Sequence, residues 1–285
     1  DKIFIEKDRG YYELNKKMWR KYKDIVRVEY SDKIQEFENY LDKKYYNKNL
    51  SNNLDFLKIK SKNFKKIIAI FPSFLHDYAI NERNRLFKSP IKWIENIIKI
   101  CTDNNFLLII REHPENKDFY NEKYNLLNIL KKHNIIIENK NNIIFINGIS
   151  NLNSYAIINN ITDLNIVYDG TLAMEIAYMG YPIILAANSK YSNKGFTYEH
   201  KDIKEYENFI LSMNKAKHQI NIKNFKKNAL EELFYEFNYN GNYFPFRVSV
   251  DEMKKRKHKF FYNLKTHNVN YNYNKDLLET LVKLS

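Results

Sequence analysis

Two short stretches hold side chains whose types and spacing suit the binding of a phosphate. In the first, Arg111 and His113 follow an apolar run and precede Pro114. Pro114 keeps His113 out of a helical conformation, so its imidazole is expected to project beyond the preceding strand. Imidazole and guanidinium donors stabilise the negative charge of a departing phosphate, which makes His113 the candidate catalytic residue and Arg111 a binding residue. The alternative is a histidine that hydrogen-bonds only its own turn.

The second stretch is the turn Asp169-Gly170-Thr171, followed by Glu175. Gly170 tolerates a positive φ and the close approach of a ligand, and Thr171 can cap a helix whose first amides face an anion. Glu175 lies one helical turn after Thr171 and can accept hydrogen bonds from a ribose diol. In the alternative interpretation, Asp169 and Thr171 are capping residues only and Glu175 is a surface acid.

The residues around this turn have the pattern of a βαβ unit. An apolar run at 164–167 predicts a strand, the residues through 179 predict a helix, and 182–185 predict a second strand. Such units connect parallel strands, and ligands of open parallel sheets bind beyond the carboxyl ends of those strands. The turn is therefore the first place to expect a ligand.

The remaining elements extend this pattern to a full sheet. Further strands are predicted at 67–71, 106–110 and 143–146, and helices at 90–102, 121–132, 152–159 and 201–213. Five strands separated by helices predict an α/β fold with a Rossmann-like parallel sheet. Glycine-rich dinucleotide and P-loop motifs do not occur in the sequence, so a nucleotide would have to be held another way.

Other strand ends and loops should meet at the same edge of the sheet. Ser73 and Gly148 each follow a predicted strand, and the loop at 188–197 follows the last one. This loop could close over a ligand through Tyr191, Gly195 and Thr197. Each is an ordinary loop residue alone, and their expected convergence makes them candidates for substrate binding.

The chain divides into three predicted regions. Residues 1–62 are read as a connecting and bracing segment, 63–213 as the Rossmann-like nucleotide-binding domain, and 214–285 as a basic helical extension. In the extension, a predicted helix at 249–265 combines lysines with Phe260 and Phe261. Such a helix can lie on an anionic membrane surface, and a solvated helix is the alternative.

Composition narrows the class of protein. The net charge is +13, yet only eight of the 47 basic residues are arginine, the preferred reader of phosphate and guanine, which argues against nucleic acid as a partner. No apolar run approaches the roughly 20 residues of a membrane-spanning helix. The single Cys101 fits a reducing cytoplasm, with peripheral contact at the inner membrane as a further interpretation. Zinc-ligand and hydrolase motifs do not occur, so neither a metal nor a cofactor is expected.

Three motifs together resemble a known family. They are REHP at 111–114, VYDGTLAMEIAYMGYPII at 167–184 and YSNKGFTYE at 191–199, and they are similar to sequences of bacterial capsular polysaccharide biosynthesis proteins. That family includes Kdo transferases and, more loosely, CDP-glycerol-dependent teichoic acid polymerases. Its turn often reads N-S-T or S-S, where this chain has Asp169-Gly170-Thr171, and Glu175 matches the family's glutamate. The resemblance covers roughly residues 65–212.

The resemblance implies the nucleotide-binding half of a GT-B fold, in which an active site lies between two Rossmann-like domains. It implies that His113 and Pro114 contact the donor phosphate, that the acceptor-binding domain lies before residue 1 or is supplied elsewhere, and that no bound metal is needed. The expected function is transfer of a sugar from a nucleotide-activated donor, for example a CMP-linked one, to a surface polysaccharide. Its partners would be a nucleotide-sugar donor and a glycan or glycolipid acceptor.

Two other functions stay open at this point. A CDP-glycerol-type enzyme would keep the fold and transfer a polyol phosphate. A non-catalytic module would use a degenerate GT-B half to bind a glycan or a protein partner. Donor, acceptor, linkage, stereochemical outcome and oligomeric state are not fixed by the sequence.

Overall fold

The computed structural model describes residues 2–3, 31–46, 54–73, 84–113, 125–138, 140–234 and 242–243. The chain forms two compact units, one from residues 1–22 with 234–285 and one from 23–233. In the first unit, β1 (Lys2–Ile3) pairs antiparallel with β7 (Asn242–Tyr243). Pro114 and the helix expected at 249–265 lie outside the described residues, so the membrane-contact hypothesis stays a prediction.

The second unit contains a five-stranded parallel sheet, as the alternation of apolar strands and helices predicts. Its strand order is β4-β3-β2-β5-β6. The strands are β2 (Ile67–Phe71), β3 (Leu107–Arg111), β4 (Ile143–Ile146), β5 (Leu164–Val167) and β6 (Ile183–Leu185). Successive strands run outward from β2 to β4 and then resume on the other side of β2, so the order reverses between β2 and β5. Ligands of open α/β sheets bind at such a reversal.

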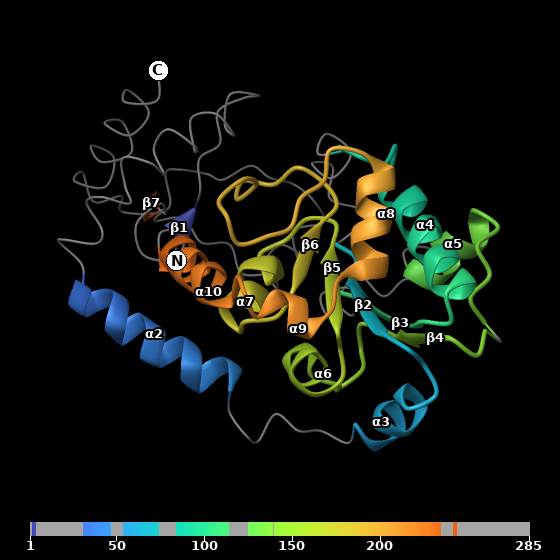
Figure 1. Ribbon diagram of the computed structural model, residues 1–285, viewed down its shortest axis with the longest axis horizontal. Helices are drawn as coiled ribbons and strands as arrows, with labels where there is room; N and C mark the ends of the chain where they lie inside the picture. The colour runs from blue at the N-terminus through green and yellow to red at the C-terminus, as the bar shows by residue number, and fades with distance from the viewer. Residues whose placement is uncertain are drawn as a thin grey trace, which may run out of the picture. The chain divides into compact units, whose positions relative to one another are not determined.

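Helices cover both faces of the sheet (Figure 1). One face packs against α4 (Pro90–Asp103), α5 (Leu126–Lys132) and α8 (Ile203–Ser212). The other packs against α2 (Ser31–Tyr45), α3 (Asp55–Ser61), α6 (Ser154–Asn160), α7 (Leu172–Tyr178) and α10 (Ile222–Phe234), and the short α9 spans Lys215–His218. The sheet is thus the middle of three layers, which confirms the expected α/β, Rossmann-like fold.

Residues from outside the predicted central domain complete this core. Leu41 and Leu57, from the predicted bracing segment, are buried in the same hydrophobic cluster as Ala229 of α10. Residues 23–233 form one compact unit that spans both predicted boundaries. The boundaries at 62 and 213 themselves stay predictions.

Polar caps fix where several helices begin. Ser89 accepts a hydrogen bond from the amide of Lys92, as its place before Pro90 predicts. Asn153 accepts from the first amides of α6, which explains why that helix begins at Ser154, two residues later than expected. Strand β3 runs one residue further than expected and ends at Arg111, which lies opposite Ile146. That extension turns the Arg111 side chain inward, where it is buried.

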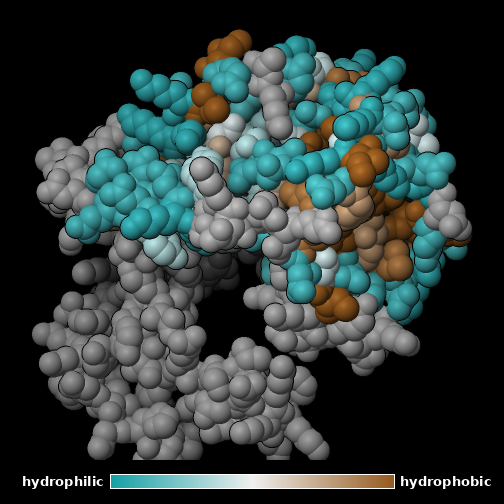
Figure 2. Space-filling model, turned by 90° about the horizontal axis from the view of Figure 1, so that it is seen from below, coloured by the Kyte–Doolittle hydropathy of each residue, from teal (hydrophilic) through white to brown (hydrophobic). Residues whose placement is uncertain are grey.

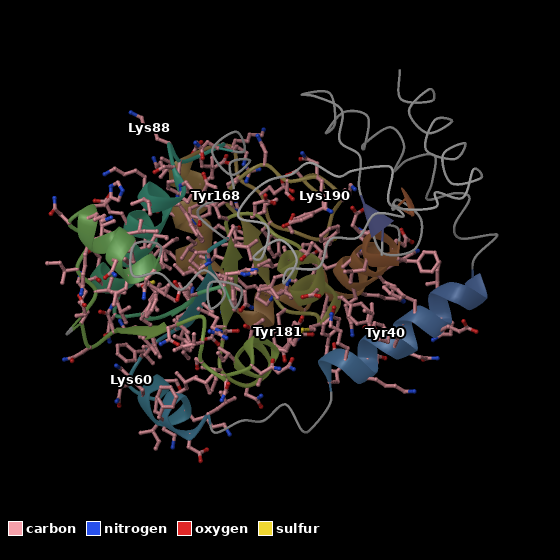
Figure 3. All side chains as sticks on the ribbon, turned by 180° about the vertical axis from the view of Figure 1, so that it is seen from behind. Tyr40, Lys60, Lys88, Tyr168, Tyr181 and Lys190 are labelled. Carbon is pink, nitrogen blue, oxygen red and sulfur yellow. The ribbon has the colours of Figure 1, made fainter. Side chains whose placement is uncertain are left out.

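The surface of the described residues is mostly hydrophilic when seen from below, with hydrophobic groups gathered on one side (Figure 2). Side chains fill the space between sheet and helices, whereas Tyr40 on α2 is 57% exposed (Figure 3). Among the described helices, none combines the length and the apolar character that crossing a bilayer requires.

Candidate functional site

A pocket of about 680 Å³ lies at the carboxyl edge of the sheet, where β2 and β5 are neighbours. Residues 71–73, 111–113, 150–155, 167, 169–172 and 175 line it. We call residues 111–113 with the loop at 147–154 the β3 wall, and residues 169–175 the α7 wall. Seven predicted site residues are among those that line the pocket: Ser73, Arg111, His113, Asp169, Gly170, Thr171 and Glu175.

The β3 wall begins with the buried Arg111. Its two terminal nitrogens donate hydrogen bonds to the carbonyls of Asn147 and Ser150, so the fork holds the loop that follows β4. Its Nε has no hydrogen-bond partner among the described residues. Burial lowers the pKa of the guanidinium, and the charge of Glu112 opposes that shift. Arg111 therefore shapes the wall and brings positive charge to it, while direct contact with a phosphate stays a prediction.

Glu112 is a residue that the sequence analysis passed over. It is 1% exposed, and its carboxylate accepts from the amide of Leu126 at 2.9 Å and from the amide of Gly148 at 2.9 Å. One acid thus ties the start of α5 and the loop after β4 to the end of β3. The sequence signal that could have identified Glu112 is an acidic residue between two basic residues, directly after a buried strand. Gly148 supplies its amide to this tie and lies outside the pocket lining.

His113 follows this pair and is half-buried at the pocket. Because Arg111 and Glu112 fix the backbone on either side of the strand end, His113 is carried on a rigid support. It lines the same pocket as Glu175, although the two are 62 positions apart in the chain. The predicted convergence of these two side chains is present in the structure.

The turn of the α7 wall is held from behind by Tyr191. The Tyr191 hydroxyl donates to the carbonyl of Gly170 and accepts from its amide at 3.2 Å. Gly170 has φ of 143°, which only glycine adopts readily, and Ser73 donates to the neighbouring carbonyl of Asp169. Burial, followed by the charge of Asp169, raises the pKa of Tyr191 well above its usual value. The turn therefore enters the pocket with its backbone geometry fixed.

The structure contradicts the expectation that the Thr171 side chain caps α7. Thr171 occupies the N-cap position of α7, yet within the described residues its side chain makes no capping hydrogen bond. Its φ of −60° and ψ of −24° are already helical, whereas a capping threonine needs an extended backbone. Thr171 is exposed and lines the pocket, and contact of its hydroxyl with a ligand stays a prediction.

Glu175 is neither a surface acid nor an isolated carboxylate. It is 8% exposed, and its Oε1 accepts from the Tyr45 hydroxyl at 2.7 Å and from Lys44 Nζ at 3.2 Å. Its Oε2 accepts from the Tyr155 hydroxyl at 2.9 Å. Tyr45 and Lys44 belong to α2, about 130 residues earlier in the chain. The sequence analysis missed both because nothing local relates them to Glu175.

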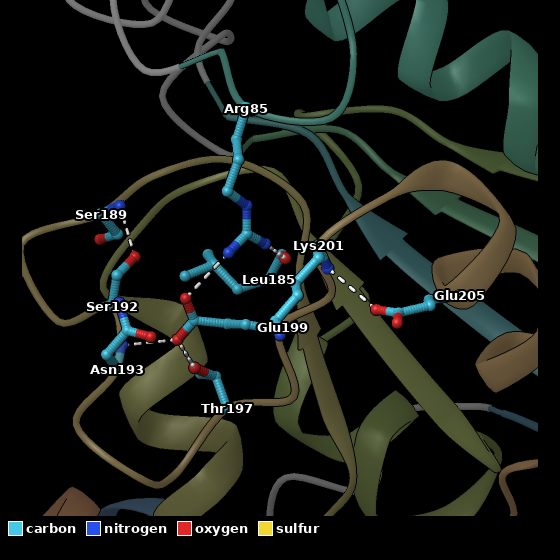
Figure 4. A network of polar contacts seen from close by, with 9 residues as sticks. All are labelled: Arg85, Leu185, Ser189, Ser192, Asn193, Thr197, Glu199, Lys201 and Glu205. Carbon is cyan, nitrogen blue, oxygen red and sulfur yellow. Dashed lines mark hydrogen bonds and ion pairs between the residues drawn. The ribbon is translucent and has the colours of Figure 1, made fainter.

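The loop expected to close over a ligand is anchored elsewhere. Lys194 forms a buried ion pair with Glu232 of α10 at 2.6 Å, and the Gly195 carbonyl accepts from Asn228. Thr197 donates to Glu199, whose carboxylate also pairs with Arg85 at 2.9 Å (Figure 4). Tyr191, Gly195 and Thr197 thus have partners within the protein and lie outside the pocket lining. Their contact with a ligand stays a prediction.

Within the described ranges, His, Cys, Asp and Glu side chains form no group of three or more that could hold a metal ion. The expectation of a reaction that uses neither a metal nor a cofactor stays a prediction.

In comparisons with known proteins, no family model matches the sequence, and no curated protein matches it. Similar solved structures include the wall teichoic acid polymerase TagF, with 14% identity over 65% of this chain and 48% of that one and a TM-score of 0.38. The beta Kdo 2,7 transferase KpsC of Thermosulfurimonas dismutans has 17% identity over 57% of this chain and 50% of that one, with a TM-score of 0.34.

A third similar structure is the alpha,alpha-trehalose 6-phosphate synthase of Burkholderia multivorans, with 11% identity over 65% of this chain and 44% of that one and a TM-score of 0.44. The chain therefore spans about half the length of these proteins. Membership of the capsular polysaccharide family stays a prediction.

Proposed function

We propose that the pocket binds the nucleotide of an activated sugar donor, and that the chain is the donor half of a GT-B-type glycosyltransferase of bacterial surface polysaccharide. The single observation behind this proposal is that His113 and Glu175, from different walls, line one pocket at the reversal of strand order. The pocket volume of about 680 Å³ is within the usual range of small-molecule sites.

Charge divides the pocket into two parts. The β3 wall brings the Arg111 guanidinium and the His113 imidazole, and the Glu112 carboxylate beside them is already bound to two backbone amides. The α7 wall brings the carboxylates of Asp169 and Glu175. We infer that the phosphates lie towards the β3 wall and the ribose hydroxyls towards Glu175, because each arrangement pairs opposite charge or donor with acceptor.

In the proposed reaction, the oxygen of an acceptor hydroxyl bonds to the anomeric carbon of the sugar, the bond from that carbon to the phosphate oxygen breaks, and the proton of the hydroxyl passes to solvent. The departing phosphate gains negative charge as the glycosidic bond to it breaks, and His113 stabilises that charge by donating a hydrogen bond. Arg111 contributes a fixed positive charge nearby. Thr171, Ser73 and the backbone of Gly170 assist in holding the donor, which we propose to be CMP-linked. The acceptor is a glycan or glycolipid, and the reaction takes place in the cytoplasm.

Calorimetry with CMP, CDP, UDP and GDP on the intact chain tests this proposal. We expect a cytidine nucleotide to bind, and His113→Ala to weaken its binding about tenfold because a hydrogen bond to a charged group is lost. His133→Ala is a matched control, because His133 is exposed at the end of α5 and outside the pocket lining. If none of the four nucleotides binds to the wild-type chain, or if His113→Ala binds the nucleotide as tightly as His133→Ala does, the proposal fails.

The same nucleotide screen leads to a test of the transferred group. Release of CMP together with incorporation of glycerol phosphate would assign the chain to polyol-phosphate transfer instead. Unchanged cellular glycan in a strain carrying His113→Ala would favour a non-catalytic binding module.

A further inference from the structure

The Glu175 carboxylate is held by side chains that a ligand cannot replace. Three donors reach it: Tyr45 at 2.7 Å and Lys44 at 3.2 Å on Oε1, and Tyr155 at 2.9 Å on Oε2. A carboxylate offers about four acceptor positions, so these donors leave about one for a further hydroxyl. The orientation of Glu175, and with it the direction of that remaining position, is set by its protein partners.

Towards Glu175 the two tyrosines act as donors, and the Tyr45 oxygen also accepts from Lys44 Nζ at 3.2 Å. Burial raises the pKa of both Tyr45 and Tyr155, and the negative charge of Glu175 raises them further. Each hydroxyl therefore keeps its hydrogen and directs it at the carboxylate. The rings of the two tyrosines meet edge to face, with centroids 4.9 Å apart, which fixes their positions relative to one another.

The three donors differ in their access to a ligand. Tyr155 lines the pocket beside Glu175, so it could touch a ligand directly. Tyr45 is fully buried and, like Lys44, is not among the described residues that line the pocket. Tyr45 and Lys44 can therefore influence a bound molecule only through pocket residues that they contact, which are Glu175 and the ring of Tyr155.

The carboxyl end of α2 is itself docked on the helices that carry the site. Asn159 of α6 donates to the backbone carbonyl of Tyr45 at 3.2 Å. Tyr178 of α7 donates to Asp42 at 2.6 Å. These contacts come from the same two helices that supply Tyr155 and Glu175, so α2 holds its two donors in register with the carboxylate.

We propose that Tyr45 and Lys44, at the end of α2, are positioning residues that act through Glu175 and set the selectivity of the pocket for a nucleotide with an intact ribose diol. This inference rests on the proposed function, because it assumes that the pocket takes a nucleotide. It adds that a segment outside the predicted nucleotide-binding domain determines which sugar ring is accepted. Loss of either donor should allow Glu175 to turn away from the diol.

The test compares each of the four ribonucleotides CMP, CDP, UDP and GDP with its 2′-deoxy form by calorimetry on the full chain. Wild type should bind the ribonucleotide about tenfold more tightly, as expected for one hydrogen bond to a charged acceptor. Tyr45→Phe should reduce this ratio to less than about threefold by weakening the ribonucleotide alone. Lys44→Met should act in the same direction, and its exposed side chain makes a folding defect avoidable.

Tyr206→Phe is the matched control. It removes a fully buried tyrosine hydroxyl that accepts from Trp93 on the other face of the sheet, away from α2, Glu175 and the pocket lining. Its ratio should equal that of wild type. If Tyr45→Phe and Lys44→Met keep the wild-type ratio, or weaken both nucleotides equally, the inference is overturned while the proposed function stands. If wild type binds none of the four nucleotides, the proposed function fails and this inference fails with it.

Discussion

The two walls of the pocket are held in place by different kinds of contact. In the β3 wall, Arg111 and Glu112 are neighbours in sequence and bind backbone groups of one adjacent loop and one helix end. In the α7 wall, Glu175 depends on side chains from α2 and α6 that are 131 and 20 positions away. The first wall is built from one strand end, and the second exists only once distant helices have packed. Substitution of Glu112 in the β3 wall should therefore act mainly on stability, and substitution of Glu175 in the α7 wall mainly on binding.

The largest stability effect should come from the β3 wall. Glu112→Ala leaves two buried amides without an acceptor, so we expect the free energy of unfolding to fall by about 3 kcal/mol. Urea denaturation measures the change. Glu138→Ala is the control, because Glu138 forms an exposed ion pair with Lys131 whose loss should cost less than about 0.5 kcal/mol. Equal effects of the two substitutions would contradict the assigned role of Glu112.

The corresponding change in the α7 wall should be smaller in stability and larger in binding. Glu175→Gln keeps the shape but replaces one acceptor by a donor that faces hydroxyl or ammonium hydrogens. We expect a loss of about 1 to 2 kcal/mol in the free energy of unfolding and about a tenfold loss of nucleotide affinity. Denaturation and calorimetry on the same preparation measure both. A stability loss as large as that of Glu112→Ala, with binding unchanged, would reverse the contrast between the walls.

Alkaline pH should weaken the α7 wall selectively. The pKa values of Tyr45 and Tyr155 are raised by burial and then by Glu175, so in the folded protein both stay protonated above the usual pKa of about 10. The stability that they contribute is fully present below about pH 10 and is lost at higher pH, where the unfolded chain ionises first.

The stability difference between wild type and a Tyr45→Phe/Tyr155→Phe variant should therefore shrink by about 3 kcal/mol between about pH 8 and pH 11, about 1.4 kcal/mol for each tyrosine. Urea midpoints at several pH values measure it. Other buried tyrosines titrate in both proteins and cancel in the difference. A difference that stays constant with pH would show that these hydroxyls are not held by Glu175.

The smallest effect should come from the turn that begins the α7 wall. Thr171→Ala should change the free energy of unfolding by less than about 0.5 kcal/mol, because its side chain makes no capping hydrogen bond in the described structure. Asn153→Ala should cost about 1 kcal/mol, because Asn153 does cap α6. Thermal denaturation of the two variants makes the comparison, and equal losses would restore Thr171 as a cap.

The sequence predicted the strands well because their signals are local. Ile67–Phe71 is continuously apolar, Leu164–Val167 is apolar except for Asn165, and polar or turn residues flank both, so their limits are as expected. The cap at Ser89 was equally local. The order of the strands was not predicted, because no periodicity along the chain records which strand pairs with which. The end of β3 was missed by one residue because a buried arginine is read as polar.

In the candidate site, too, the residues with a local sequence signal were predicted, and those whose contacts depend on packing were not. His113, Gly170 and Glu175 were found because they follow strand ends, where ligands of parallel sheets bind. Tyr45 and Lys44 were missed because their relation to Glu175 depends on how α2 packs. Gly195 and Thr197 were assigned to the pocket because their loop follows β6, but the buried Lys194–Glu232 pair, 38 residues apart in sequence, directs that loop to α10.

A crystal structure of the chain with bound cytidine nucleotide would test most directly whether the two walls form one donor site. We predict phosphate oxygens within hydrogen-bonding distance of His113 and a ribose hydroxyl on the Glu175 carboxylate, with the Tyr45 and Tyr155 contacts retained. A nucleotide bound outside the pocket, or one that reaches His113 while its ribose lies away from Glu175, would contradict the account.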